Sequence, residues 1–226
     1  MNWFIEYEGD ILDRFELYLN GEYIPWVDEV PADDFYLVHC VSGDNAQGAG
    51  FAKVLNDRYH FRDALCADLA ESFPGFGTDR WHFSKSLGEF YRIPLNPNYT
   101  LGDTQYMKFE GKIGSIYATE RCPNILGLVT KDHYYEKPTL DTMRTALKSL
   151  HDRLDTVYYY CDEQPLLTEI MMPHIGCGLD ELKWDDVKEI IFEELRDLGE
   201  KGYIRVVAIA PSEKRITLWE NLSKNK

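Results

Sequence analysis

The sequence predicts an α/β protein built as a three-layer α/β/α sandwich around a mixed, mostly parallel central sheet. The first observation is that short apolar runs typical of strands alternate along the chain with longer segments of helical periodicity. The second is that residues 35–41 and 203–210 are apolar on both faces, as expected of strands that helices cover on each side. Both observations favour a sheet buried between two layers of helices.

Apolar or β-branched runs mark the expected strands. They cover residues 3–7, 35–41, 113–118, 125–130, 166–172 and 203–210. Two helices are expected between the earlier runs, one from Ala49 past Leu55 and one from Phe61 to Leu69.

Two longer helices are expected in the second half of the chain. One starts near Pro138, whose missing N–H costs little in a first helical turn. Its apolar face consists of Leu140, Met143, Leu147, Leu150 and Leu154. The other has acidic residues in its first turn, which the helix dipole favours, and ends at Gly199 or Gly202. Its apolar stripe consists of Trp184, Val187, Ile191, Leu195 and Leu198.

Residues 1–226 are expected to form a single domain with insertions at about 11–34 and 73–111. The first range separates two expected strands by more than a turn, and the second is rich in proline, glycine and aromatic residues. Trp81, Phe83, Phe90 and Tyr91 make the second range too apolar for a free loop, so we expect it to carry its own packing.

The net charge of −15 disfavours phosphate backbones and anionic membranes as partners. A nucleic-acid partner is disfavoured but not excluded, because Lys53, Arg58 and Arg62 could form a local basic groove. The five cysteines include no C-x-x-C pair, so we expect neither a disulfide framework nor a metal site. No leader or membrane-spanning run is evident, and the sequence therefore predicts a soluble cytoplasmic protein without a cofactor.

Two glycine-containing loops follow expected strands. In the stretch 171–180 an apolar run ends at Pro173, a Gly-x-Gly turn follows, and Asp180 stands before a helix. The second loop is Gly48-Ala49-Gly50, which also opens a helix. Glycines let backbone N–H groups approach an anionic ligand closely, and such loops at the carboxyl ends of strands are typical ligand sites.

The order of these motifs resembles that of a macrodomain, a fold family that binds ADP-ribose. The resemblance is strongest to the branch of the terminal ADP-ribose protein glycohydrolase, which removes ADP-ribose from modified acidic side chains. The matching segments are 9–11, 39–42, 48–52, 129–131, 137–139 and 173–180. The resemblance implies one macrodomain over 1–226, and ADP-ribose or an ADP-ribosylated protein as the partner.

The resemblance also implies a set of ligand-binding residues. Asp10 would accept a hydrogen bond from the adenine amino group, and Ile11 would lie beside the ring. The two glycine loops would clasp the pyrophosphate and the distal ribose through backbone amides. The full set is Asp10, Ile11, Ser42, Gly48, Ala49, Gly50, Phe51, Ile175, Gly176, Cys177, Gly178 and Leu179.

The implied catalytic residues are Lys131 and Asp180. Hydrolases of the MacroD type use an aspartate after a triple-glycine loop, and Ala52 stands at that position here. In the terminal glycohydrolase branch a lysine attacks the anomeric carbon while an aspartate acts as general acid and base. The resemblance therefore implies a hydrolase that releases terminal ADP-ribose from acyl linkages to glutamate or aspartate.

Several alternatives stay open. Lys131 alone reads as a solvated lysine at a strand end, and Asp180 alone as a carboxylate in the first turn of a helix. A second function is a module that binds ADP-ribose without turnover. A third is a hydrolase acting on ADP-ribose-1″-phosphate (Appr-1-p processing), O-acetyl-ADP-ribose or ADP-ribosylated nucleobases.

Overall fold

The computed structural model describes residues 2–21, 32, 34–71, 80–84, 89–93, 106–107, 111–160 and 167–211. Their main sheet has six strands in the order β1-β9-β8-β2-β7-β6. The strands are β1 (Phe4–Gly9), β2 (Asp34–Ser42), β6 (Ile116–Tyr117), β7 (Ile125–Lys131), β8 (Thr168–Pro173) and β9 (Ile204–Pro211). Every neighbouring pair is parallel except β6 with β7, which confirms the predicted mixed, mostly parallel α/β sheet.

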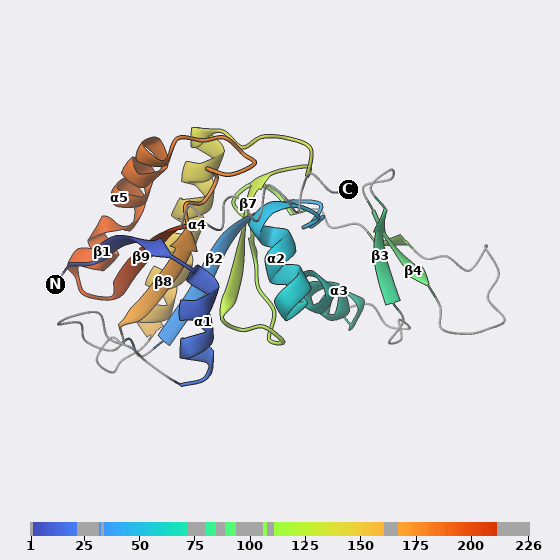
Figure 1. The fold of residues 1–226 in the computed structure, drawn as a ribbon, viewed down its shortest axis with the longest axis horizontal. Coiled ribbons are helices and arrows are strands. Elements are labelled where there is room, and N and C mark those ends of the chain that lie inside the picture. The colour runs from blue at the N-terminus through green and yellow to red at the C-terminus, as the bar shows by residue number, and fades with distance from the viewer. Residues whose placement is uncertain are drawn as a thin grey trace.

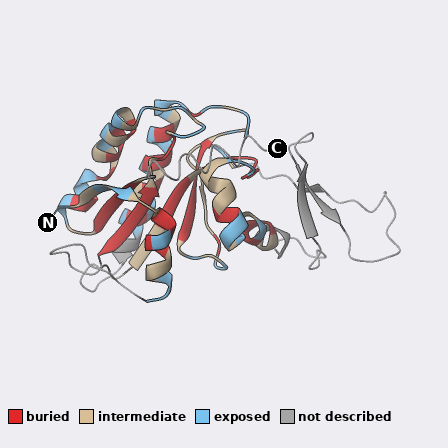
Figure 2. Cartoon of the chain, viewed as in Figure 1, coloured by how far each residue is buried: buried red, intermediate tan, exposed pale blue. Residues whose placement is uncertain are grey.

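Helices cover both faces of this sheet (Figure 1). On one face lie α4 (Leu140–Tyr160) and α5 (Trp184–Glu200), and on the other α1 (Ile11–Leu19), α2 (Gly50–Tyr59) and α3 (Phe61–Glu71). Strand alternation builds the two cores: Val206 and Ala208 pack with α4 and α5, whereas Val207 and Ile209 pack with the other helices. Figure 2 shows the resulting buried sheet between amphipathic helices, as the apolar runs predicted.

The two ranges predicted as insertions have different contents. The range 11–34 begins with α1, and its Leu12 and Phe15 side chains belong to the main core. The range 73–111 contains a separate antiparallel sheet of β3 (Arg80–Ser84), β4 (Glu89–Ile93) and β5 (Tyr106–Met107). The side chains of its four predicted packing aromatics lie outside the described part of the chain, so the division into one domain with insertions stays a prediction.

The predicted strand at 113–118 was wrong at both ends. Only Ile116 and Tyr117 are strand, because the chain turns at Gly114, whose φ of +89° lies in the left-handed region. The neighbouring backbone still pairs with β7, since Gly114 donates to the carbonyl of Val129 and Val129 donates to the carbonyl of Ser115. Apolar content predicted the pairing, and the turn glycine shortened the strand.

Four cysteines lie in the described part of the chain, Cys40, Cys66, Cys122 and Cys177, and all are free. Cys161, the fifth in the sequence, is outside the described residues. None of the helices among the described residues is both long and apolar enough to cross a membrane.

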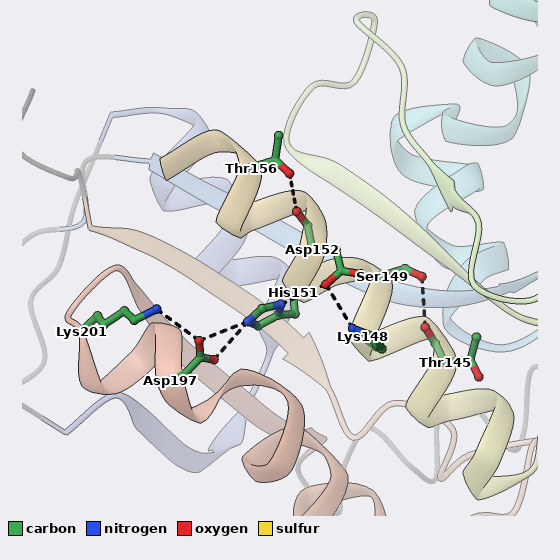
Figure 3. A network of polar contacts seen from close by, with 8 residues as sticks. All are labelled: Thr145, Lys148, Ser149, His151, Asp152, Thr156, Asp197 and Lys201. Carbon is green, nitrogen blue, oxygen red and sulfur yellow. Dashed lines mark hydrogen bonds and ion pairs between the residues drawn. The ribbon is translucent and has the colours of Figure 1, made fainter. Parts of the chain in front are cut away.

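A polar network joins α4 to α5 on the protein surface (Figure 3). The His151 ring lies 3.1 Å from a carboxylate oxygen of Asp197 on α5 and 3.2 Å from one of Asp152 on its own helix. Lys201 also contacts the Asp197 carboxylate, and Lys148 also contacts that of Asp152. Burial opposes the ionised form of Asp197, but the contacts with His151 and Lys201 outweigh it and lower its pKa. The hydrogen bond from His151 is the main cause that lowers the pKa of Asp152.

Replacing His151 with alanine is expected to lower the free energy of unfolding by about 0.5 kcal/mol at pH 6, a small effect because solvent screens these exposed pairs. A carboxylate with a lowered native pKa stabilises the fold above its ordinary pKa of 3.8 and loses that contribution as the pH falls through the native value. Urea unfolding of both proteins at pH 6 and pH 2.5 should therefore show a difference that disappears in acid. An equal difference at both pH values would contradict this account.

Candidate functional site

The carboxyl ends of β8, β2 and β7 are adjacent at one edge of the sheet, and each continues into a loop. The loops after β2 and β8 are the two glycine loops, and they touch. A Cβ atom added to Gly50 would lie 3.2 Å from Cδ1 of Leu179, and the φ of Gly50 is +58°. Only glycine combines that backbone conformation with so close an approach at low cost. The fold therefore brings together the two loops that the sequence singled out.

Lys131 and Asp180 form an ion pair at the carboxyl ends of these strands. The ammonium nitrogen Nζ of Lys131, the last residue of β7, lies 2.5 Å from Oδ1 of Asp180, which is 49 residues away in the sequence. Their side chains are 15% and 16% exposed, so both are largely shielded and still reachable from solvent. A short charge-assisted contact of this kind is a route for proton transfer between the two groups.

A β-bulge immediately precedes Lys131. Val41 of β2 pairs with Val129, whereas the next residue, Ser42, pairs with Lys131, so Thr130 is the extra residue. A bulge re-aims the side chains that follow it and is common beside active sites. The backbone pairing continues beyond the bulge, since the N–H of Gly43 donates to the carbonyl of Lys131 over 2.8 Å. The bulge thus directs Lys131 while the strand ends remain joined.

Besides burial, the Asp180 carboxylate helps to raise the pKa of two nearby thiols, those of Cys40 and Cys177. Burial, and then the Asp180 carboxylate, raise the pKa of Cys40 to about 12 and that of Cys177 to about 11. Both cysteines are therefore protonated thiols at neutral pH, which disfavours a thiolate nucleophile here. His39 is also uncharged, because its burial lowers its pKa to about 3, and its ring packs against Phe61.

Asp44 is a residue of this edge that the sequence reasoning missed. Its carboxylate is 3% exposed and accepts hydrogen bonds from the Ser42 hydroxyl over 2.5 Å and from the N–H of Tyr134 over 3.0 Å. Its own N–H donates to the carbonyl of Asp132. Asp44 therefore ties the loop after β2 to the segment after Lys131. The available signal was the Asp-Asn pair after a strand, which is typical of turns stabilised by side chains.

Lys137 joins the segment after Lys131 to the second glycine loop. Its Nζ donates to the carbonyl oxygen of Leu179 and lies 3.1 Å from a carboxylate oxygen of Glu181. These two contacts flank Asp180 in the sequence. Lys137 belongs to the Lys-Pro-Thr segment that contributed to the family resemblance, and its contacts help to fix the backbone on which Asp180 sits.

The predicted adenine residues lie at the other end of the same edge. Asp10 follows β1 and caps α1, accepting a hydrogen bond from the N–H of Leu12 over 2.9 Å. The Ile11 side chain is buried in the core beneath α1. Two strands, β9 and β8, separate β1 from β2, so the strands that lead to Asp10 and to the glycine loop after β2 are about 14 Å apart, at about 4.8 Å per strand. Asp10 and Lys131 are therefore not brought into contact.

The remaining predicted ligand residues occupy the two glycine loops in different environments. Ser42 and Ile175 are buried, Phe51 and Cys177 are partly buried, and Gly48, Ala49 and Gly178 are exposed. Gly176 has a φ of +73°, and a Cβ there would lie 2.7 Å from the Met143 side chain. Within the described ranges, no group of three or more His, Cys, Asp or Glu side chains is arranged to hold a metal ion.

Sequence comparison finds relatives with a named activity. The bovine and human proteins named ADP-ribose glycohydrolase OARD1 are 27% and 26% identical to this chain over 157 residues, covering 70% of it and 72% of each relative. An uncharacterised protein, 032R, of Invertebrate iridescent virus 6 is 32% identical over 88 residues, covering 39% of this chain and 80% of the viral one. No family model matches the chain.

Solved structures with the same fold are macrodomains. The macrodomain of Mycobacterium tuberculosis DarG has a TM-score of 0.55 at 16% identity, covering 94% of this chain and 100% of that one. The macrodomain of Thermus aquaticus DarG has a TM-score of 0.51 at 18% identity, covering 92% and 97%. The six-stranded sheet with its two contacting glycine loops thus has the macrodomain architecture. The chain thus has the macrodomain fold, and in sequence it is similar to relatives named ADP-ribose glycohydrolase.

Proposed function

We propose that this protein is an ADP-ribosyl hydrolase that releases terminal ADP-ribose from acyl linkages to glutamate or aspartate side chains. The observation that carries the proposal is the 2.5 Å contact between Nζ of Lys131 and Oδ1 of Asp180 beside two touching glycine loops. The relatives named ADP-ribose glycohydrolase support the reaction class. Lys131 serves as the nucleophile and Asp180 as the general acid and base.

The proposed reaction has two steps. In the first, Asp180 takes a proton from Lys131, and the free amine forms a bond to the anomeric carbon of the distal ribose. The bond from that carbon to the acyl oxygen breaks, and the substrate side chain leaves as a carboxylate with the bonding electrons. In the second, a water oxygen bonds to the same carbon and the water loses a proton to solvent, while the bond from that carbon to the Lys131 nitrogen breaks and Asp180 returns its proton to the departing amine. ADP-ribose and the original Lys131–Asp180 pair are regenerated.

In the proposed binding mode, backbone N–H groups hold the anionic ligand instead of lysine side chains. The glycine loops after β2 and β8 would hold the pyrophosphate and distal ribose, and Asp10 would accept a hydrogen bond from the adenine amino group. The separation of about 14 Å between β1 and β2 suits an elongated ligand with adenine at one end and the reacting carbon at the other. Ligand affinity should accordingly depend only weakly on salt.

One observation favours a second candidate, a binding module without turnover. Lys131 is already paired with Asp180, and an ammonium group held in an ion pair has no lone pair with which to attack. Such a protein would bind ADP-ribose or an ADP-ribosylated protein and leave the linkage intact. The two candidates share the cleft and differ only in whether the pair transfers its proton.

Calorimetry with ADP-ribose, AMP and NAD tests the shared part, and a release assay separates the candidates. We expect selective binding of ADP-ribose in the micromolar range, about −8 kcal/mol. The release panel contains a glutamate-linked ADP-ribosylated peptide, ADP-ribose-1″-phosphate, O-acetyl-ADP-ribose and an ADP-ribosylated nucleobase. Release from the glutamate-linked peptide supports the hydrolase, and binding without release from any substrate supports the binding module. Preferential release from one of the other three would assign a different substrate, and absence of binding would contradict both candidates.

A further inference from the structure

Exposed apolar side chains follow Lys131 and adjoin Asp180 in the sequence. Of the five large hydrophobic residues that are exposed in the described part of the chain, four belong to residues 134–140 or to the second glycine loop. Tyr135 is 68% exposed and Leu179 is 60% exposed, the two largest values among these five residues. We call Tyr134, Tyr135 and Leu179 the aromatic rim. Grouped exposure of this kind at the edge of a site marks an interaction surface.

The backbone under the aromatic rim is held in place. The N–H of Tyr134 donates to the buried Asp44 carboxylate, and Lys137 donates to the carbonyl of Leu179. The Tyr135 ring stacks on the His133 ring, with centroids 5.3 Å apart and planes 16° from parallel. A rim fixed in this way presents its side chains without a large ordering cost on binding, as interface residues with few rotatable bonds do.

The charges around the aromatic rim are predominantly negative. Asp132 is exposed and makes no ion pair with any described residue. Glu181 is 79% exposed and its only described ion pair is the solvated one with Lys137. Lys131 is likewise neutralised by Asp180. Lys131 and Lys137 therefore both have acidic partners, and the negative charge of Asp132 is not balanced by either of them. The protein as a whole has a net charge of −15.

We propose that the aromatic rim and Asp132 bind the polypeptide part of the substrate, and that they select lysine or arginine next to the modified side chain. This inference rests on the proposed function, because it concerns what surrounds the linkage to be cleaved. A cationic side chain is attracted both to an exposed tyrosine face and to a carboxylate, and the two here come from the four-residue segment 132–135. The surplus negative charge disfavours the phosphate backbone of a nucleic acid at the same place.

The experiment compares two glutamate-linked ADP-ribosylated peptides that differ only in their flanks, one with lysines and one with glutamates. O-acetyl-ADP-ribose serves as an acyl substrate without a peptide. We expect the wild-type protein to prefer the lysine-flanked peptide about tenfold in kcat/KM, and less at high salt. Tyr135→Ala should lower kcat/KM for that peptide about fourfold and Asp132→Asn about threefold. Both variants should cleave O-acetyl-ADP-ribose, or bind free ADP-ribose, as the wild-type protein does.

Matched controls are Leu19→Ala, an exposed apolar side chain at the end of α1, and Asp155→Asn, an exposed carboxylate on α4. Neither should change the peptide preference. Equal rates on the two peptides, or an equal loss on the peptide and the small substrate, would overturn the inference. If the wild-type protein cleaves nothing, the proposed function fails, and titration with the two modified peptides decides the inference alone. Tighter binding of the lysine-flanked peptide then supports it, and equal affinities reject it.

Discussion

Replacing Lys131 with methionine is expected to lower the single-turnover rate of ADP-ribose release about a thousandfold or more, because the proposed nucleophile is removed. Methionine keeps much of the length and apolar volume of the lysine stem, so the loss should not reflect unfolding. Asp180 loses its partner, but at 16% exposure it can still be reached by water. Calorimetry should accordingly show ADP-ribose binding of the variant within a few-fold of the wild-type value.

Asp180→Asn tests the other half of the pair. Asparagine keeps the shape of the side chain and cannot accept a proton from the amine, so we expect a loss of similar size. Lys148→Met is the matched control, since this lysine is exposed on α4 and contacts only Asp152 among the described residues. Full activity of Lys131→Met, with Lys148→Met as reference, would exclude the lysine as nucleophile. Mass spectrometry of the acid-quenched wild-type reaction should detect the sugar adduct on Lys131.

The second large effect is expected from Gly43→Ala, which should lower the free energy of unfolding by about 3 kcal/mol. A Cβ at this position would lie 2.1 Å from the carbonyl oxygen of Gly111 and 3.1 Å from that of Asp132. Both obstacles are backbone atoms, so no side-chain rotation relieves the clash. The Gly111 segment, which donates its N–H to the carbonyl of Gly43, must move away. Chemical denaturation measures the loss directly.

Gly178→Ala is the control for this substitution. It lies in the other glycine loop, and a Cβ there meets nothing within 4 Å. Its unfolding free energy should stay within about 0.5 kcal/mol of the wild-type value. If Gly43→Ala were as stable as Gly178→Ala, the contact between the loop after β2 and Gly111 would not contribute to the fold. We also expect Gly43→Ala to lose ADP-ribose release, since Gly43 pairs directly with Lys131.

The central fold could be predicted because its physical signals are local. The runs 35–41 and 203–210 are apolar except at His39 and Arg205, and the structure packs alternate residues of both strands into opposite cores. The helix beginning at Leu140 likewise buries the predicted Met143 and Leu147. Composition could not place the turn at Gly114, since it depends on one backbone angle and on the pairing with β7.

The candidate site was predictable to a different degree. The motif order pointed to Lys131 and Asp180, and the structure places their charged atoms in contact, while their catalytic roles stay a prediction. The bulge at Thr130 was not predictable, because it exists only in the register between β7 and β2. Asp44 was missed for a related reason: its partner Tyr134 is 90 residues away, and a turn-forming aspartate has no local feature that distinguishes it.

The position of β1 has a consequence for how the protein is made. Among the described residues this strand pairs only with β9, where Phe4 faces Val206, so β1 depends on a partner that is synthesised about 200 residues later. The strands that bear Lys131 and lead to Asp180 are complete before β9 leaves the ribosome. A nascent chain can thus bring Lys131 and Asp180 together while the segment ending at Asp10 is still unattached. As an edge strand, β1 is expected to open more readily than the inner strands β2 and β8, which would loosen the backbone at Asp10 before that at Asp180.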